Sequence, residues 1–305
     1  GTITAQNNNI QINSTGSVDI IDTITSNGGN VIIGAGTTLD LGVGLISSAG
    51  GAVTFSSVNA MNLSGPVTTS GGAFNADVTG AGLLSLQNDI NTSGGNVDIT
   101  TANGLLSSIA GADIDASGGA GTSSVRLESL NGTQSLLVGG SVLSGTGGQT
   151  LRAGDHVTLN GAVTSGGPTE ITSDSNNGGI GTLAVNAPVQ VNGAGSLTLR
   201  GRAFTQGATG TLTTSGGIID ADFNDAYAIS EVVSSNGGSI SFLGDNGITV
   251  NAVVSSAPPA GGTGSLVLRG GVTLNATPVV GDSDVILDGN GLDLIINTLM
   301  AFDSA

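Results

Sequence analysis

Short runs in which apolar and polar residues alternate recur along almost the whole chain, and glycines separate them. In a typical repeat, Val31 and Ile33 follow a glycine pair, Leu39 and Leu41 lie near the middle, and a shorter apolar position such as Val67 comes before the next glycines. A spacing of two residues is the period of a β-strand that buries one face. The pattern therefore predicts three short strands in each repeat.

Glycine pairs set the period of this pattern. Most neighbouring pairs are about 21 to 24 residues apart, and they lie at Gly28-Gly29, Gly50-Gly51, Gly71-Gly72, Gly94-Gly95, Gly118-Gly119, Gly147-Gly148, Gly166-Gly167, Gly216-Gly217, Gly237-Gly238 and Gly261-Gly262. A repeat of this length indicates a solenoid. Because no stretch shows the apolar spacing of a helix, we expect an all-β parallel β-helix with about 22 residues and three short strands per coil.

The repeat predicts one continuous β-solenoid rod over residues 1–305, with longer corner loops near 128–145, 173–181 and 257–264. One internal column of stacked apolar side chains is expected from Val31, Val53, Val97, Leu197, Ile240 and Leu266. Asparagines follow the second apolar run at one corner, where Ser64 and Gln87 hold equivalent places: Asn160, Asn186, Asn251 and Asn275. Stacked amides can hydrogen-bond from coil to coil, so a ladder is expected at this corner.

Composition narrows the function classes. The 305 residues carry a formal charge of -17, and five arginines are the only basic side chains apart from one histidine. Such a chain is repelled by phosphate backbones, so nucleic-acid binding is not expected. No apolar run reaches the roughly 18 residues of a membrane span, and membrane insertion is not expected either. The first residues lack the features of a signal peptide, which we interpret as a mature product or an excised segment.

The densest acidic cluster suggests a calcium site. Asp220, Asp222, Asn224 and Glu231 occupy positions one, three, five and twelve of a calcium-loop spacing, and oxygen ligands at those positions suit this hard cation. Position six, where such loops have glycine, is Asp225. The alternative is that Asp220 and Asp222 lie on the outward face of a strand. No other cofactor is expected.

Residues for other chemistry are scarce, because the chain has no Cys, no Lys, no Trp and one histidine, His156. If Asp155 and His156 began a strand, they would point to opposite faces, so Asp155 is not expected to orient the imidazole. Four arginines each lie beside an apolar position of the first run and are expected to form one outward column: Arg126, Arg152, Arg200 and Arg269. These features favour a protein without catalytic activity.

Residues 157–167 (VTLNGAVTSGG) and 89–99 (DINTSGGNVDI) resemble the β-strand repeats of filamentous-haemagglutinin-like bacterial exoproteins. The resemblance implies a right-handed β-helix that is secreted to the cell surface and serves in adhesion, biofilm or an extracellular fibre. The alternative on the same scaffold is an enzyme, a lyase or hydrolase, that acts on polysaccharides through surface carboxylates.

Strand-like alternation begins at once, with Ile3, Ile10 and Ile12, and runs to Leu292, Leu294, Ile296 and Leu299. An open final coil would expose backbone donors, acceptors and apolar side chains. We therefore expect both end coils to be covered by more solenoid, either in a longer polypeptide or in a second copy stacked end to end into a fibre. The expected partner is the protein itself.

Overall fold

The computed structural model describes residues 1–119, 121–131, 134–257, 264–280, 284–298 and 301–302. The chain folds as a parallel β-solenoid of about 13 turns, with roughly 22 residues and three strands per coil, and no helix occurs among its described residues. The predicted all-β solenoid is confirmed. Two compact units, Gly1–Gly154 and Asp155–Ala305, can be distinguished, and each is described by itself. A single continuous rod remains a prediction.

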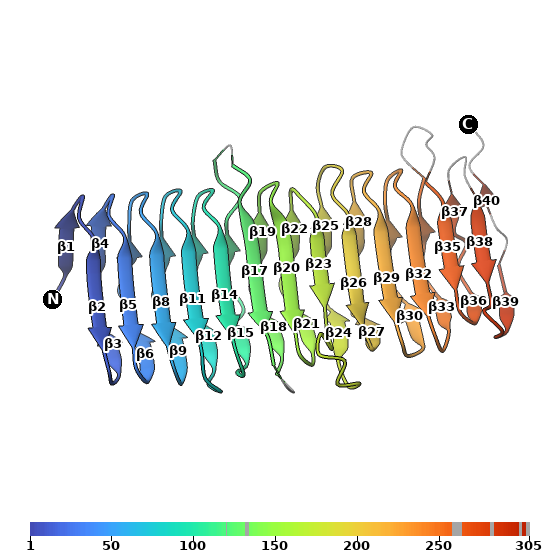
Figure 1. Cartoon of the computed structure of the whole chain (residues 1–305). Coiled ribbons are helices and arrows are strands. Elements are labelled where there is room, and N and C mark those ends of the chain that lie inside the picture. The colour runs from blue at the N-terminus through green and yellow to red at the C-terminus, as the bar shows by residue number, and fades with distance from the viewer. Residues whose placement is uncertain (120, 132–133, 258–263, 281–283, 299–300, 303–305) are drawn as a thin grey trace. The chain divides into compact units, whose positions relative to one another are not determined.

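In unit 1, residues 1–154, each coil contributes strands in turn to three parallel sheets, A, B and C (Figure 1). Sheet A comprises β1 (Ile3–Gln6), β4 (Ile24–Asn27), β7 (Ile46–Ser47), β10 (Val67–Thr68), β13 (Ile90–Asn91), β16 (Ile114–Asp115) and β19 (Val142–Ser144). Sheet B comprises β2 (Ile10–Ser14), β5 (Val31–Ala35), β8 (Val53–Ser57), β11 (Phe74–Val78), β14 (Val97–Thr101), β17 (Ser124–Ser129) and β20 (Gly148–Ala153). Sheet C comprises β3 (Val18–Ile20), β6 (Thr38–Leu41), β9 (Ala60–Leu63), β12 (Leu84–Leu86), β15 (Leu106–Ser108) and β18 (Leu136–Val138).

In unit 2, residues 155–305, the third side of the coil is divided between sheet C and a separate sheet D. Sheet A comprises β22 (Val163–Ser165), β25 (Val189–Val191), β28 (Leu212–Thr214), β31 (Val233–Ser234), β34 (Val254–Ser255), β37 (Val279–Val280) and β40 (Ala301–Phe302). Sheet B comprises β23 (Thr169–Thr172), β26 (Leu197–Gly201), β29 (Ile219–Phe223), β32 (Ile240–Gly244), β35 (Leu266–Arg269) and β38 (Val285–Asp288). Sheet C comprises β21 (Val157–Leu159), β24 (Thr182–Val185) and β27 (Ala203–Gln206), and sheet D comprises β30 (Tyr227–Ile229), β33 (Ile248–Val250), β36 (Val272–Leu274) and β39 (Leu294–Ile296).

The core of each unit is a set of columns in which equivalent residues of successive coils stack. In unit 1, Phe74 lies in register with Val53 and Val97, and in unit 2, Ile240 lies in register with Ile219 and Leu266. All six side chains are at most 1% exposed. The predicted internal column is therefore confirmed within each unit, and each coil buries its apolar face only because its neighbours cover it.

The glycine pairs close the corner between sheets A and B. Before the second glycine, Thr69 donates its hydroxyl hydrogen to the carbonyl oxygen of Gly72, and Ser70 and Gly71 both have positive φ. A Cβ on Gly72 would lie 2.1 Å from the carbonyl oxygen of Gly51 in the preceding coil. The hydrogen bond from the hydroxyl group, the turn with positive φ and the close approach of the preceding coil all occur at this corner. They explain why a Ser or Thr stands two positions before the first glycine of many pairs.

Side-chain ladders run along the corner after sheets C and D, as the asparagine pattern predicts. Asn186 donates through Nδ2 to Oδ1 of Asn160 at 2.9 Å. Asn275 donates in the same way to Asn251 at 2.8 Å and accepts from Asn297 at 2.8 Å. The ladder is confirmed at these corners, and it fastens neighbouring coils on the solvent side.

Longer connections separate some neighbouring strands. Residues 173–181 separate β23 from β24, at the position expected for a loop. The segment 128–145, expected as a loop, contains β18 and β19. The longer connections in this part of unit 1 separate β16 from β17 and β17 from β18. The third expected loop, 257–264, lies mostly outside the described residues, as do Gly261-Gly262 and Leu299.

Candidate functional site

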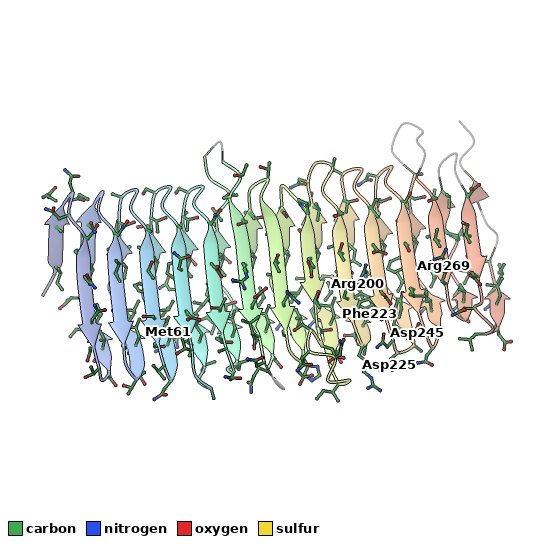
Figure 2. All side chains as sticks on the ribbon, in the orientation of Figure 1. Met61, Arg200, Phe223, Asp225, Asp245 and Arg269 are labelled. Carbon is green, nitrogen blue, oxygen red and sulfur yellow. The ribbon has the colours of Figure 1, made fainter. Side chains whose placement is uncertain are left out.

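The predicted ligands Asp220 and Asp222 lie on β29 and face outward from sheet B of unit 2. Their neighbours Ile219, Ala221 and Phe223 are fully buried, and adjacent strand residues point to opposite faces. The two carboxylates are therefore on one outer face, as the strand interpretation expects. Figure 2 labels Arg200 in the preceding coil, Asp225 just after β29 and Asp245 just after β32 in the following coil.

Arg200 on β26 neutralises Asp220. Its Nη2 forms an ion pair with Oδ2 of Asp220, and its Nη1 donates to the carbonyl oxygens of Leu199 and Asp220 at 3.0 and 3.1 Å. The guanidinium thus lies between two coils and binds the backbone and the side chain of the second one. A carboxylate held in this way is not free to coordinate a cation fully.

Asp222 is in a different electrostatic environment. Partial burial raises the pKa of its carboxyl group, and the negative charges of Asp245 and Asp220 raise it further, while Arg200 acts in the opposite direction. Beneath this face, Tyr227 is 5% exposed and donates to the carbonyl oxygen of Leu243 at 3.3 Å. Burial, followed by the charge of Asp222, raises the pKa of Tyr227 well above its ordinary value.

The other two predicted ligands are separated from this face. Asn224 lies in the turn after β29, where its carbonyl oxygen accepts from Asn246 at 2.7 Å. Glu231 lies beyond β30, at the next corner of the coil. Its backbone N–H donates to Oε1 of Gln206 at 3.3 Å. Among the described residues no group of three or more His, Cys, Asp or Glu side chains is placed to hold a metal ion. Calcium binding stays a prediction, and a rise in the melting temperature with millimolar calcium that Asp222→Ala removes would support it.

A second charged cluster lies on sheet B of unit 1. Arg126 forms ion pairs with Asp98 in the preceding coil at 3.1 Å and with Glu128 on its own strand. Arg152, in the following coil, lies 3.8 Å from the other oxygen of Glu128. The Glu128 side chain is only 4% exposed, so two guanidinium groups compensate one buried carboxylate.

The prediction of one outward arginine column is wrong for Arg126. Sheet register places Arg126 opposite Thr150 and places Arg152 opposite Glu128, so the two arginines occupy different outward rows. The reason is that Arg126 follows the first inward residue of its strand, Val125, whereas Arg152 follows the second, Leu151. Both arginines bridge coils, a role shared by Arg200 and by Arg202, which pairs with Asp225 at 3.0 Å.

The expectation that Asp155 and His156 begin a strand and point to opposite faces is wrong. Asp155 Oδ1 lies 3.3 Å from Nε2 of His156, because both residues precede β21 and do not follow the alternation of a strand. Nδ1 of His156 accepts the backbone N–H of Thr182 at 3.0 Å. The imidazole, 46% exposed, therefore supports the neighbouring coil.

A shallow hollow of about 340 Å³ on sheet A of unit 1 contains three carboxylates, those of Asp89, Asp113 and Asp115. Asp89 accepts from the backbone N–H of Asp113 at 3.0 Å, and Asp113 accepts from that of Ser141 at 2.7 Å. Asp115 accepts from Ser117 at 2.8 Å. These carboxylates cap the backbone of the next coil or of their own turn.

Sequence reasoning missed Glu128 and Gln206. The signal for Gln206 was present, because the second run of its repeat reads Phe204, Thr205, Gln206 where other repeats place an apolar residue third. No comparable signal exists for Glu128, whose burial depends on arginines from its own strand and from the next coil.

A scan against protein-family models found no match, and neither did searches of curated proteins and of solved structures. The β-helical repeat architecture agrees with the coarse implication of the sequence resemblance. The part of the chain that the structure describes contains no helix that could cross a bilayer.

Proposed function

We propose that the protein is an extracellular structural or adhesive protein without catalytic activity, a β-helical shaft or fibre subunit at a bacterial cell surface. The observation that carries this proposal is that polar and charged side chains join successive coils. Arg126, Arg152, Arg200 and Arg202 all pair with acidic residues, and the asparagine ladders run in the same direction.

Contacts of this kind resist separation of the coils along the direction in which they stack. In a solenoid each repeat is stabilised mainly by its neighbours, so links between coils determine how well the body holds together. Single exposed ion pairs contribute little, but many links in a regular array add up. The resemblance to filamentous-haemagglutinin-like repeats supports the same function and adds secretion to the cell surface.

Localisation can be tested with antibodies raised against purified residues 1–305. Immunogold electron microscopy of intact source cells is expected to label the cell surface or extracellular fibres. The matched control is the same cells after permeabilisation. Label that appears only after permeabilisation would contradict the proposed location.

We also propose that the partner is a second copy or further solenoid of the same polypeptide. On β39, Leu294 and Ile296 are 44% and 47% exposed, whereas Val272 and Leu274, their register partners on β36, are fully buried. Another coil on β39 would bury these side chains. Purified residues 1–305 are expected to form filaments or concentration-dependent aggregates, and a monodisperse monomer at high concentration in sedimentation would refute self-association.

A polysaccharide-acting enzyme is the second candidate, favoured by one observation at sheet B of unit 2. Burial and neighbouring carboxylates raise the pKa of Asp222, while Asp220 forms an ion pair with Arg200. Acid–base cleavage of glycosides uses two carboxyl groups in different electrostatic environments. Turnover of acidic or neutral polysaccharides that Asp222→Asn abolishes, and that Asp40→Asn on sheet C of unit 1 leaves unchanged, would replace the shaft proposal with this one.

A further inference from the structure

Hydrogen bonding between coils is interrupted on one side of unit 2. Sheet C ends at β27 and sheet D begins at β30, although these two strands occupy the same side of successive coils. Sheets A and B continue through the same two coils, because β28 pairs with β31 and β26 pairs with β29. One of the three sides of the solenoid is therefore unpaired where the other two are paired.

The interruption coincides with a polar residue at an inward position. Gln206 is in register with Val185, which is in register with Leu159, and both of those side chains are fully buried. Beyond the interruption, Ile229 and Val250 continue the apolar series. A glutamine amide cannot join an apolar column without hydrogen-bond partners, so its needs disturb the local stacking.

Gln206 finds those partners in backbone groups that flank the interruption. Its Nε2 donates to the carbonyl oxygen of Gly210 at 2.7 Å. Its Oε1 accepts from the backbone N–H groups of Ser230 and Glu231 at 3.0 and 3.3 Å. One side chain thus binds the next coil just past the end of β30 and stands in for strand pairing there.

A second set of contacts, between Arg202 and Asp225, joins the two coils at the other end of the unpaired span. We call these contacts and those of Gln206 the two fastenings. Arg202 forms an ion pair with Asp225 at 3.0 Å, and the backbone N–H of Asp225 donates to the carbonyl oxygen of Arg202 at 2.7 Å. Both side chains are more than 40% exposed, so solvent screens their attraction. The span between the fastenings contains β27 up to Gln206 and all of β30.

Aromatic rings fill the interior beside this span. Phe204 stacks on Phe223 with a centroid separation of 5.0 Å, and Tyr227 packs against both rings edge-on at 5.8 and 5.2 Å. Gly244 makes room for Tyr227, because a Cβ there would lie 2.9 Å from its ring. Ring contacts of this type give cohesion without a strand ladder.

We propose that the span between β27 and β30 is a joint in unit 2, at which sheets C and D separate while sheets A and B stay paired. Opening there breaks the two fastenings and ring contacts but no strand ladder, so it costs less than opening between any two paired strands of the third side. The joint lets the coils before and after it tilt, with the continuous sheets acting as the hinge. It is a property of unit 2 and holds whether the solenoid is a shaft or an enzyme scaffold.

Hydrogen–deuterium exchange of intact residues 1–305, read by mass spectrometry, tests the joint. Peptides covering 203–211 and 226–232 are expected to exchange about tenfold faster, or more, than those covering 182–188 and 247–252 on the same side. Peptides covering β28 and β29 are expected to stay as protected as the corresponding strands of neighbouring coils. Equal protection at 203–211, 226–232 and the flanking peptides overturns the proposal.

A pair of glutamine variants separates a local fastening from general stability. Gln206→Ala is expected to raise exchange at residues 226–232 about fivefold further, because it removes two acceptor contacts to the backbone. Gln190→Ala is the matched control, since the Gln190 amide donates to Asn192 at 2.8 Å away from the joint. Exchange that rises uniformly over unit 2 in Gln206→Ala, or equally at the joint in both variants, would show that Gln206 fastens no joint.

Discussion

Carboxylates on the outer faces of sheet B differ in how their charge is compensated. Glu128 is enclosed by Arg126 and Arg152, and the side-chain hydrogen bond to Glu128 is the largest reason why the pKa of Arg126 is raised. Asp222 has Arg200 nearby but also two acidic neighbours, and its pKa is raised. The carboxylate of Glu128 is therefore compensated by positive charge, whereas the ionised form of the Asp222 carboxylate is disfavoured.

Glu128→Gln is expected to lower the free energy of unfolding by about 1–3 kcal/mol. The variant keeps the shape of the side chain but leaves two guanidinium groups without their shared counter-charge. Both arginines are about half exposed, so the loss falls below that for a fully buried pair. Chemical denaturation measures it, and Asp98→Asn, whose carboxylate is 42% exposed, is the control expected to cost less. An unchanged free energy of unfolding in Glu128→Gln would show that the cluster adds no stability.

Asp222→Asn is expected to raise the melting temperature at about pH 7 and to have no effect below about pH 3. The folded protein holds the Asp222 proton to a higher pH than the unfolded chain does, since the folded pKa lies above the ordinary value of 3.8. Folded stability therefore falls as pH rises from that value through the raised pKa, and the amide removes this loss. Thermal melts across pH measure the difference, and a gain that persists unchanged in acid would contradict the electrostatic cause.

Among the elements, the corner between sheets A and B depends on glycines that have no room for a Cβ. Gly72→Ala is expected to cost at least about 1–3 kcal/mol, because the new Cβ would lie 2.1 Å from the carbonyl oxygen of Gly51 and the coils would have to move apart. Denaturant unfolding measures the cost. Gly16→Ala is the matched control, since its nearest neighbour would be Ser14 Oγ at 3.8 Å. Equal stability of the two variants would show that coil spacing adapts freely.

Strand positions could be predicted from the sequence because inward residues such as Val53 and Val97 repeat at a fixed period and must stack. The asparagine ladder followed from the same period. The environment of Asp220 and Asp222 could be predicted only in part, because alternation gives the face of a strand but not the partner in the next coil. Arg200 lies 20 residues before Asp220, and nothing local in the sequence indicates which acid it binds.

Bends between strands escaped prediction for a related reason. The alternation predicts strand geometry for Asp155 and His156, yet both precede β21 and lie outside any strand, where alternation gives no information. The joint at Gln206 is a second case in which the sequence gives only part of the answer. A polar residue in an apolar run is visible in the sequence, but whether the coil tolerates it depends on backbone groups of Ser230 and Glu231 in the next coil.

At the scale of the whole molecule, a solenoid is expected to tolerate the loss of a complete coil but not of part of one. Val67 pairs with Ile46 on one side and with Ile90 on the other, so deleting residues 67–89 lets Ile90 take the place of Val67. The same deletion brings Val97 opposite Val53 in sheet B, where Phe74 now lies. Every inward residue of the following coil thus meets an inward residue of the preceding one.

Deleting residues 67–89 is therefore expected to preserve the β-sheet circular dichroism spectrum and a melting temperature within about 10 °C of the parent chain. Deleting residues 67–77 is the matched control, because it removes β10 and most of β11 but leaves β12, so the strands that follow meet the wrong side of the preceding coil. That variant is expected to lose cooperative melting of unit 1. Equal damage from both deletions would mean that residues 67–89 are not an interchangeable repeat and that coil identity, rather than coil register, holds the unit together.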